Sequence, residues 1–359
     1  MLDGSDVIVF DEFWHFLSIG ELHLMSQTCR RAKDELRVKA QPRVRINKFE
    51  VGLSLMRSFS KVKLIVRDGG ILAISNENLS ELTRLTELSF FCIEQGDCWN
   101  EPRSIRKLIN LEWLEIDRYP FVAEDLKFLG KLTNLSLHSN PIRGESLSVM
   151  TNLTLLDITN CSYVDDDSLR NFPNLSHLRI GWCGSIISDK GLSHVPKLRS
   201  LYVDGNKYVT GEGILTLTCL QILRIRNTRQ MGEYLSRMTC LKELQLPGSD
   251  VSITDSVIEK MVGLESLLLD GNDVITANGV AKLVSLRKLR VYGATRDFFD
   301  IKALSSLSKL EELILYNTDI TFENVRCLRN LTSLDVRSNR GFDNVNLFEV
   351  FPKLRELKR

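Results

Sequence analysis

Residues 175–203 read LSHLRIGWCGSIISDKGLSHVPKLRSLYV, and the pattern of this stretch decides the fold. Its first six residues, LSHLRI, and its last six, LRSLYV, both carry apolar residues at the first, fourth and sixth places. Apolar residues two places apart are typical of a short strand with one buried face. The residues between the two copies bring the chain back to the start of the next strand. The stretch therefore indicates a repeating unit made of a strand and a return segment.

The same spacing recurs through most of the chain. Successive copies lie 21 to 26 residues apart, and a weaker copy at residues 59–64 precedes them. This pattern and this period resemble those of the leucine-rich repeat. The first leucine of each copy falls at Leu85, Leu111, Leu132, Leu153, Leu175, Leu198, Leu220, Leu241, Leu264, Leu286, Leu310, Leu331 and Leu354.

The repeats predict an α/β leucine-rich-repeat solenoid over residues 41–359, with about 14 repeats. Because no unit can bury its apolar face alone, neighbouring units are expected to stack into one parallel sheet. The strands should line the inside of a curve, with short helices and loops outside. Helix starts of the Ser/Thr/Asp type predict such helices at residues 165–170, 188–192, 254–258 and 321–325. A longer segment around Trp99 is expected to leave the regular surface as a loop.

A small polar or thiol side chain follows most strands at a fixed place. Such side chains can hydrogen-bond backbone groups in the turn that leaves the strand, and we expect them to do so here. They are Asn140, Cys161, Cys183, Asn206, Thr228, Ser249, Asn272, Thr318 and Asn339.

Composition excludes several classes of protein. The 359 residues hold 47 basic and 46 acidic side chains, so the net charge of +1 gives no general attraction to nucleic acid or to a membrane surface. The eight cysteines lack zinc-finger spacing, and we expect them to be reduced. No nucleophile motif or phosphate-binding loop is present. We therefore expect a protein that is not an enzyme, with no cofactor and no metal. The acidic start lacks the basic region of a signal peptide, which predicts a cytoplasmic or nuclear location.

Residues 1–40 do not follow the repeat. Apolar residues at helical spacing predict one helix ending near Leu17 and a second from Glu21 to about Arg37, followed by a basic linker to Arg45. Within this segment, Phe16-Leu17, Glu21-Leu22 and Thr28-Cys29-Arg30 resemble the core of an F-box. We interpret residues 1–40 as an F-box-like helical module.

The resemblance implies a specific function. F-boxes bind the adaptor subunit of a cullin-RING (SCF-type) ubiquitin ligase, so the chain would be a non-catalytic substrate receptor whose repeats hold a protein. The adaptor-binding residues by motif position are Phe13, Trp14, Phe16, Leu17, Glu21, Leu22, Met25, Cys29 and Arg30. The alternative is a stand-alone interaction scaffold or inhibitor. In that case the two helices only cap the solenoid, packed near Val44, Ile46 and Leu64.

The concave strand face is the predicted site for the protein substrate. Residues between the core leucines point to the open side, and Arg, Tyr and Trp there are the types enriched at protein-binding hot spots. One cluster surrounds Arg179, a second surrounds Arg290, and an acidic stretch lies nearer the N-terminus. The candidate substrate-binding residues are Trp113, Glu115, Asp157, Arg179, Trp182, Tyr202, Arg224, Arg226, Arg290, Tyr292 and Tyr316.

Overall fold

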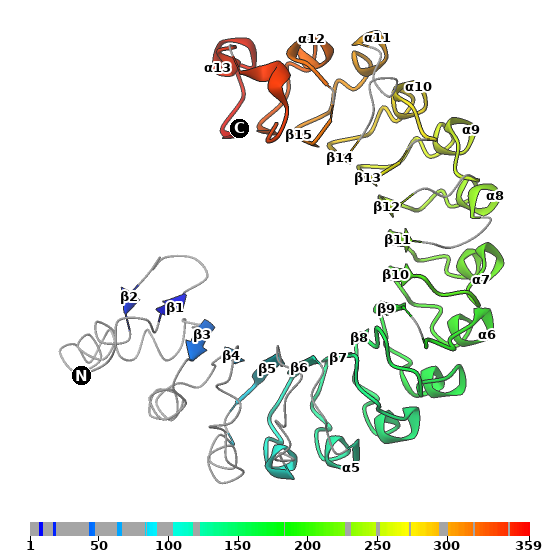
Figure 1. The fold of residues 1–359 in the computed structure, drawn as a ribbon. Helices are drawn as coiled ribbons and strands as arrows, with labels where there is room; N and C mark the ends of the chain where they lie inside the picture. Colours follow the sequence, from blue (N-terminus) through cyan, green and yellow to red (C-terminus); the bar gives the residue numbers. More distant parts are fainter. Residues whose placement is uncertain are drawn as a thin grey trace. The chain divides into compact units, whose positions relative to one another are not determined.

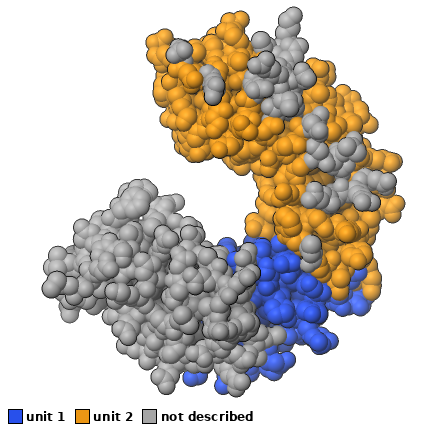
Figure 2. Space-filling model, in the orientation of Figure 1, with its two compact units in different colours: residues 1–175 blue, residues 176–359 orange. Residues whose placement is uncertain are grey.

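The computed structural model describes residues 7–9, 17–18, 43–46, 63–66, 83, 85–91, 103–117, 123–182, 184–226, 231–248, 252–272, 274–293, 301–318, 320–343 and 345–359. The chain divides into two compact units, residues 1–175 and residues 176–359, which Figure 2 shows in different colours.

In the first unit, six strands from β3 to β8 lie parallel and side by side in chain order. Short helices lie between the later strands, on the other side of the unit from the sheet (Figure 1). The strands are β1 (Val7–Val9), β2 (Leu17–Ser18), β3 (Arg43–Ile46), β4 (Lys63–Val66), β5 (Glu87–Phe91), β6 (Trp113–Asp117), β7 (Asn134–His138) and β8 (Leu155–Asp157). The helices are η2 (Arg103–Lys107), α5 (Ala123–Leu126), η3 (Gly144–Leu147) and η4 (Asp167–Asn171).

In the second unit, nine strands from β9 to β17 form a parallel sheet, again in chain order. The strands line the inner, concave side of the unit and the helices lie outside (Figure 1). The strands are β9 (His177–Gly181), β10 (Ser200–Asp204), β11 (Ile222–Arg226), β12 (Glu243–Pro247), β13 (Ser266–Asp270), β14 (Lys288–Tyr292), β15 (Glu312–Tyr316), β16 (Ser333–Asp335) and β17 (Glu356–Lys358). The helices are α6 (Asp189–Leu192), α7 (Gly211–Leu215), α8 (Gly232–Leu235), α9 (Asp255–Ile258), α10 (Ala277–Val280), α11 (Ile301–Leu304), α12 (Phe322–Val325), η6 (Arg340–Phe342) and α13 (Leu347–Val350).

The strand register confirms the predicted repeat. Leu178 pairs with Leu201, and Leu201 pairs with Leu223, so equivalent leucines stack from one strand to the next. These leucines are essentially without exposed surface, while the residues between them are half-buried or exposed. The hydrophobic core is therefore a continuous column inside each unit, and the polar residues of the strands form a second surface.

Most of the described turn residues bond to the backbone as expected, whereas the Thr318 hydroxyl donates to the side chain of Asn339. Asn206 accepts from the N–H groups of Tyr208 and Val209 at 2.8 and 2.9 Å. The Cys161 thiol donates to the carbonyl of Leu137 at 2.6 Å. Burial raises the pKa of Cys161 to about 11, so this thiol stays protonated, whereas Cys219 and Cys240 are exposed. Cys183, Thr228 and Ser249 lie outside the described residues.

The outer helices begin where the sequence predicts. The Ser188 side chain accepts from the N–H of Lys190 at the start of α6, and Thr321 forms a capping box with Asn324 at α12. The repeats are also tied to one another here. Asp255 accepts from the N–H and the hydroxyl of Thr276, at the start of the next helix, at 2.7 and 2.6 Å. A Cβ added to Gly279 would overlap Asp255, so the hydrogen bonds between Asp255 and Thr276 require a glycine at residue 279.

The N-terminal residues differ from the prediction in two places. Leu17 lies in β2, which pairs antiparallel with β1, and does not end a helix. Residues 43–46 form β3, not the end of a linker, because Val44 and Ile46 alternate with arginines and pair in parallel with β4. β1 pairs antiparallel with β3, so it covers the edge of the parallel sheet. The remainder of the predicted helices, and the loop around Trp99, lie outside the described residues.

None of the helices in the described part of the chain has the length and apolar character needed to cross a membrane.

Candidate functional site

The strand face of the second unit carries the first predicted cluster. Register places Arg179 of β9, Tyr202 of β10 and Arg224 of β11 side by side, each between two buried apolar residues of its strand. Because the strands are parallel and in phase, residues 20 or more positions apart become neighbours. The predicted cluster is thus a continuous surface across three strands.

Contacts within this cluster hold its side chains in place. The Arg179 guanidinium lies over the Tyr202 ring, 4.6 Å from its centroid. Arg224 forms an ion pair with Asp204 at 3.4 Å and donates to the amide oxygen of Gln245 at 3.3 Å. We call Arg179, Tyr202, Asp204, Arg224 and Gln245 the basic-aromatic cluster.

Trp182 and Arg226 lie at the edge of this cluster, where the strands end. The Arg226 guanidinium is 5.4 Å from the centroid of the Trp182 ring, although β10 separates their strands in the sheet. The ring of Trp182 stays 44% exposed. The two residues therefore present an aromatic face and a cation together.

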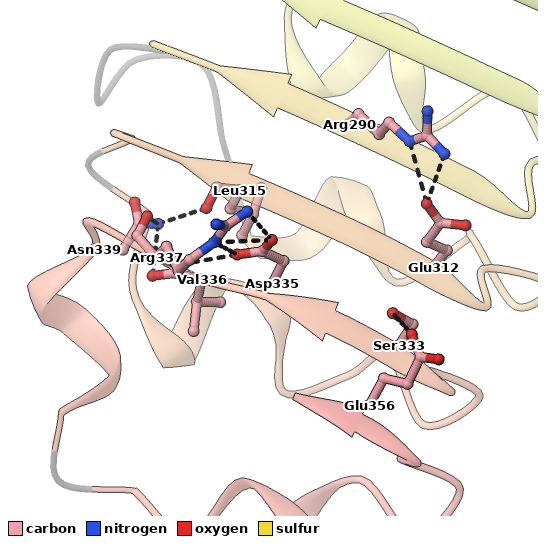
Figure 3. A network of polar contacts seen from close by, with 9 residues as sticks. All are labelled: Arg290, Glu312, Leu315, Ser333, Asp335, Val336, Arg337, Asn339 and Glu356. Atoms are coloured by element: carbon pink, nitrogen blue, oxygen red, sulfur yellow. Dashed lines mark hydrogen bonds and ion pairs between the residues drawn. The ribbon is translucent and has the colours of Figure 1, made fainter. Parts of the chain in front are cut away.

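The second predicted cluster is different because its charges are neutralised. Arg290 donates to Glu312 at 2.9 and 3.1 Å (Figure 3). Lys288 pairs with the same carboxylate at 3.1 Å. Arg337 holds Asp335 through two guanidinium nitrogens (Figure 3). The cations of this cluster are thus engaged within the chain.

These ion pairs lower the pKa values of two carboxyl groups, those of Asp335 and Glu312. Burial alone would raise the pKa of Asp335, but hydrogen bonds from Arg337 outweigh it and hold the pKa below its ordinary value. Burial likewise opposes the shift at Glu312, where hydrogen bonds from Arg290 and Lys288 hold the pKa low. Both carboxylates therefore remain charged at neutral pH.

Tyr292 and Tyr316 complete the second cluster. Their ring centroids are 6.2 Å apart and the rings are tilted by 48°. Tyr316 is 42% exposed, and Tyr292 is half-buried. The two rings offer contact area to a partner, whereas the arginines beside them are already paired with carboxylates of the same chain.

Three predicted substrate-binding residues belong to the first unit. Trp113 and Glu115 are half-buried on β6. Asp157 is buried on β8, and its carboxylate accepts from the N–H and the hydroxyl of Thr159 at 3.0 and 2.6 Å. Asp157 therefore serves the turn that leaves its strand and offers little surface to a partner.

Most adaptor-binding candidates cannot be placed. Phe13, Trp14, Phe16, Glu21, Leu22, Met25, Cys29 and Arg30 lie outside the described residues. Leu17 is described only as part of β2.

Sequence reasoning missed the carboxylates that neutralise the second cluster. It selected Arg290 but not Glu312, and it did not select the Asp335–Arg337 pair. The signal was available, since Glu312 follows Lys288 in register and opposite charges in neighbouring strands attract.

Comparisons with known proteins agree with this architecture. A probable disease resistance protein of Arabidopsis thaliana is 26% identical over 210 residues, which cover 56% of this chain and 20% of that protein. The chain thus spans about a fifth of the length of this curated relative. No protein-family profile matches the chain.

The chain is also similar to solved structures. An internalin of Listeria monocytogenes has a TM-score of 0.51 and 25% identity, covering 79% of this chain and 82% of the internalin. A leucine-rich-repeat protein of Leptospira interrogans has 16% identity and a TM-score of 0.42, covering 86% of this chain and 94% of that protein. Together with the repeat spacing and the strand register, the likeness to the internalin establishes a leucine-rich-repeat solenoid.

Proposed function

We propose that this protein is a non-catalytic interaction scaffold whose second unit binds a protein partner on its strand face. The basic-aromatic cluster is the observation that carries this proposal. It combines arginine and tyrosine, which are enriched at binding hot spots, on a continuous sheet surface.

The internal contacts of the cluster favour binding. A free arginine loses rotamer freedom when a partner immobilises it, at roughly 0.5–1.5 kcal/mol for each side chain. Arg179 is held over Tyr202 and Arg224 is held by Asp204 before any partner arrives. Part of that ordering is therefore complete in the unbound protein.

Proximity labelling in cells of the host organism tests this proposal. The test variant is Arg179→Ala with Tyr202→Ala and Arg224→Ala. The matched control is Glu259→Ala with Lys260→Ala, two exposed residues that directly follow α9 in the sequence. We expect a set of labelled proteins that the control retains and the test variant loses. An identical set from both variants, with both chains folded by circular dichroism, would refute the proposal.

The resemblance of residues 5–35 to an F-box supports a finer role, that of a substrate receptor in a cullin-RING ubiquitin ligase of the cytoplasm or nucleus. In this role the N-terminal segment binds the adaptor and the strand face holds the substrate near the ubiquitin-transfer machinery. The pairing of β1 with β3 supports the alternative, in which the N-terminal segment caps the sheet. The two roles share Leu17, which lies in β2 and pairs with β1, whereas the F-box-like positions Leu22 and Met25 lie outside β1, β2 and β3.

Co-expression with the adaptor subunit of the host separates these roles. The variant Leu22→Ala with Met25→Ala leaves β1, β2 and β3 unchanged. The receptor role predicts a complex on size exclusion with the wild type and no complex with the variant. A wild type that is folded but forms no complex would leave the scaffold with a cap as the function.

A further inference from the structure

Trp182 occupies a backbone position that small residues occupy elsewhere in the described part of the chain. Two residues after the last core residue of β7 to β10 and of β12 to β16, the backbone adopts a left-handed conformation, with φ between 51° and 102°. The other described residues at this place are glycine, asparagine or serine: Ser139, Asn160, Gly205, Gly248, Gly271, Gly293, Asn317 and Ser338. At Trp182 φ is 61°. A bulky residue is a rare occupant of this conformation and is less stable there than glycine.

Backbone contacts fix the position of Trp182 in its turn. The N–H of Trp182 donates to the carbonyl of Asp204 at 2.5 Å. This close approach needs Gly181, since a Cβ at that residue would overlap the carbonyl oxygen of Asp204. The left-handed turn then directs the indole to the edge of the strand face, under the guanidinium of Arg226. The aromatic ring is thus fixed in place and partly exposed.

Other apolar side chains are exposed nearby in the sequence. The loops that follow the neighbouring strands β9 and β10 also carry Ile186, which is 45% exposed, and Tyr208, which is 56% exposed. The loops that follow these two strands thus carry exposed apolar surface in addition to the indole.

The charges of this region favour an anionic partner. On the strand face of β9, β10 and β11, the charged residues are Arg179, Arg224, Arg226 and Asp204. The one carboxylate is engaged by Arg224. Among the described residues, no carboxylate forms an ion pair with Arg226. Its guanidinium lies over the face of the indole, an arrangement that leaves its N–H donors available for an oxyanion.

We propose that Trp182 and Arg226 form a recognition site for an acidic protein segment, in which an apolar side chain covers the indole and a neighbouring carboxylate pairs with Arg226. This inference rests on the proposed function, because it names the chemistry of the partner on the same face. A protein segment fits better than a nucleic acid, since the chain has a net charge of only +1 and the loops beside the site add Ile186 and Tyr208.

A peptide-display selection on the full chain tests the inference. A library of random twelve-residue peptides is selected against the wild type, and enriched peptides are synthesised for affinity measurements. We expect enriched sequences that place Asp or Glu within two residues of an aromatic residue or leucine. We expect their affinity to fall tenfold or more in Trp182→Asn and in Arg226→Gln, and to weaken as salt is added.

The variants are chosen so that a loss of binding is not a loss of folding. Asparagine already occupies the same turn conformation at residues 160 and 317, so Trp182→Asn preserves the turn. Phe348→Ala is the matched control, because it removes an exposed aromatic residue of the second unit that lies on α13 and outside the strand face. We expect the control to change affinity less than twofold, and thermal denaturation to confirm that all three variants fold.

Each other outcome overturns the inference. Enriched peptides without an acidic bias, peptides that bind both variants as well as the wild type, and a selection with no enrichment all contradict it. So does a fluorescein-labelled twelve-nucleotide polyuridine RNA that binds more tightly than any selected peptide and is lost in both variants. Peptides lost only in Phe348→Ala would contradict it and leave the scaffold function standing. The proximity-labelling test remains an independent measure of that function.

Discussion

Asn339 is the buried polar residue whose removal should most clearly destabilise the second unit. Its amide nitrogen donates to the carbonyls of Leu315, Val336 and Arg337 at 2.7, 3.0 and 3.0 Å, three bonds in a bifurcated arrangement (Figure 3). Its amide oxygen accepts from the N–H and the hydroxyl of Thr318 at 2.9 and 2.7 Å. The side chain thus joins the turns that follow β15 and β16. The perturbation is Asn339→Ala.

The magnitude follows from the groups left without partners. The Thr318 N–H and the Leu315 carbonyl would lose the bonds that Asn339 supplies, and both lie in buried surroundings. A buried group without a partner is unfavourable by about 1–3 kcal/mol. Two such groups give a loss of roughly 2–5 kcal/mol in the free energy of unfolding, allowing for partial access of water.

Urea denaturation followed by far-ultraviolet circular dichroism measures this loss, with hydrogen exchange at the Thr318 amide as a local readout. Asn278→Ala is the matched control, because Asn278 is exposed on α10. We expect the control to remain within about 0.5 kcal/mol of the wild type. At a urea dependence of about 3 kcal/mol per molar, the test variant should unfold at a concentration lower by roughly 1 M. Equal midpoints for the two variants, with unchanged exchange at Thr318, would refute the assigned role of the buried amide.

Three further predictions concern packing, charge and reactivity. Gly279→Ala should lower the melting temperature because the added Cβ overlaps the carboxylate of Asp255. The control Gly263→Ala should leave the melting temperature unchanged, because a Cβ at residue 263 has room. Equal melting temperatures for the two variants would contradict this prediction. Arg337→Gln removes the partner that lowers the pKa of Asp335, so wild type and variant should differ most in the free energy of unfolding at pH 7 and converge as the pH falls below about 4. A difference independent of pH would show that the carboxylate does not carry the effect. Iodoacetamide should label the exposed Cys219 and Cys240 at least about tenfold faster than Cys161, because only the thiolate reacts. Peptide mass spectrometry measures the labelling rates, and equal rates would contradict the raised pKa of Cys161.

Local rules were enough to predict the repeat, the strands and the turn residues. The alternation in a strand such as 178–180 depends only on which face is buried, and the bonds of Asn206 stay within its own turn and the preceding one. The same rules failed at residues 43–46. That strand carries two apolar residues in place of the full leucine pattern, and β3 is recognised only through its pairing with β1 and β4.

The candidate site was predictable as a set of positions but not as a set of interactions. The repeat period alone determined that Arg179, Tyr202 and Arg224 would share a face, because strands in phase align equivalent residues. Only the tertiary structure decided which side chains are engaged. It assigned Arg290 to Glu312 and Asp157 to its own turn.

What the sequence by itself determined is the solenoid and the identity of its exposed columns, since both follow from spacings within about 25 residues. The tertiary structure decided that Arg226 lies over Trp182, two strands away, and that this cation keeps its hydrogen-bond donors available. The physical reason is that such contacts depend on backbone conformation and on the side chains between them. The left-handed conformation of Trp182 is one such feature, and the period of the leucines does not contain it.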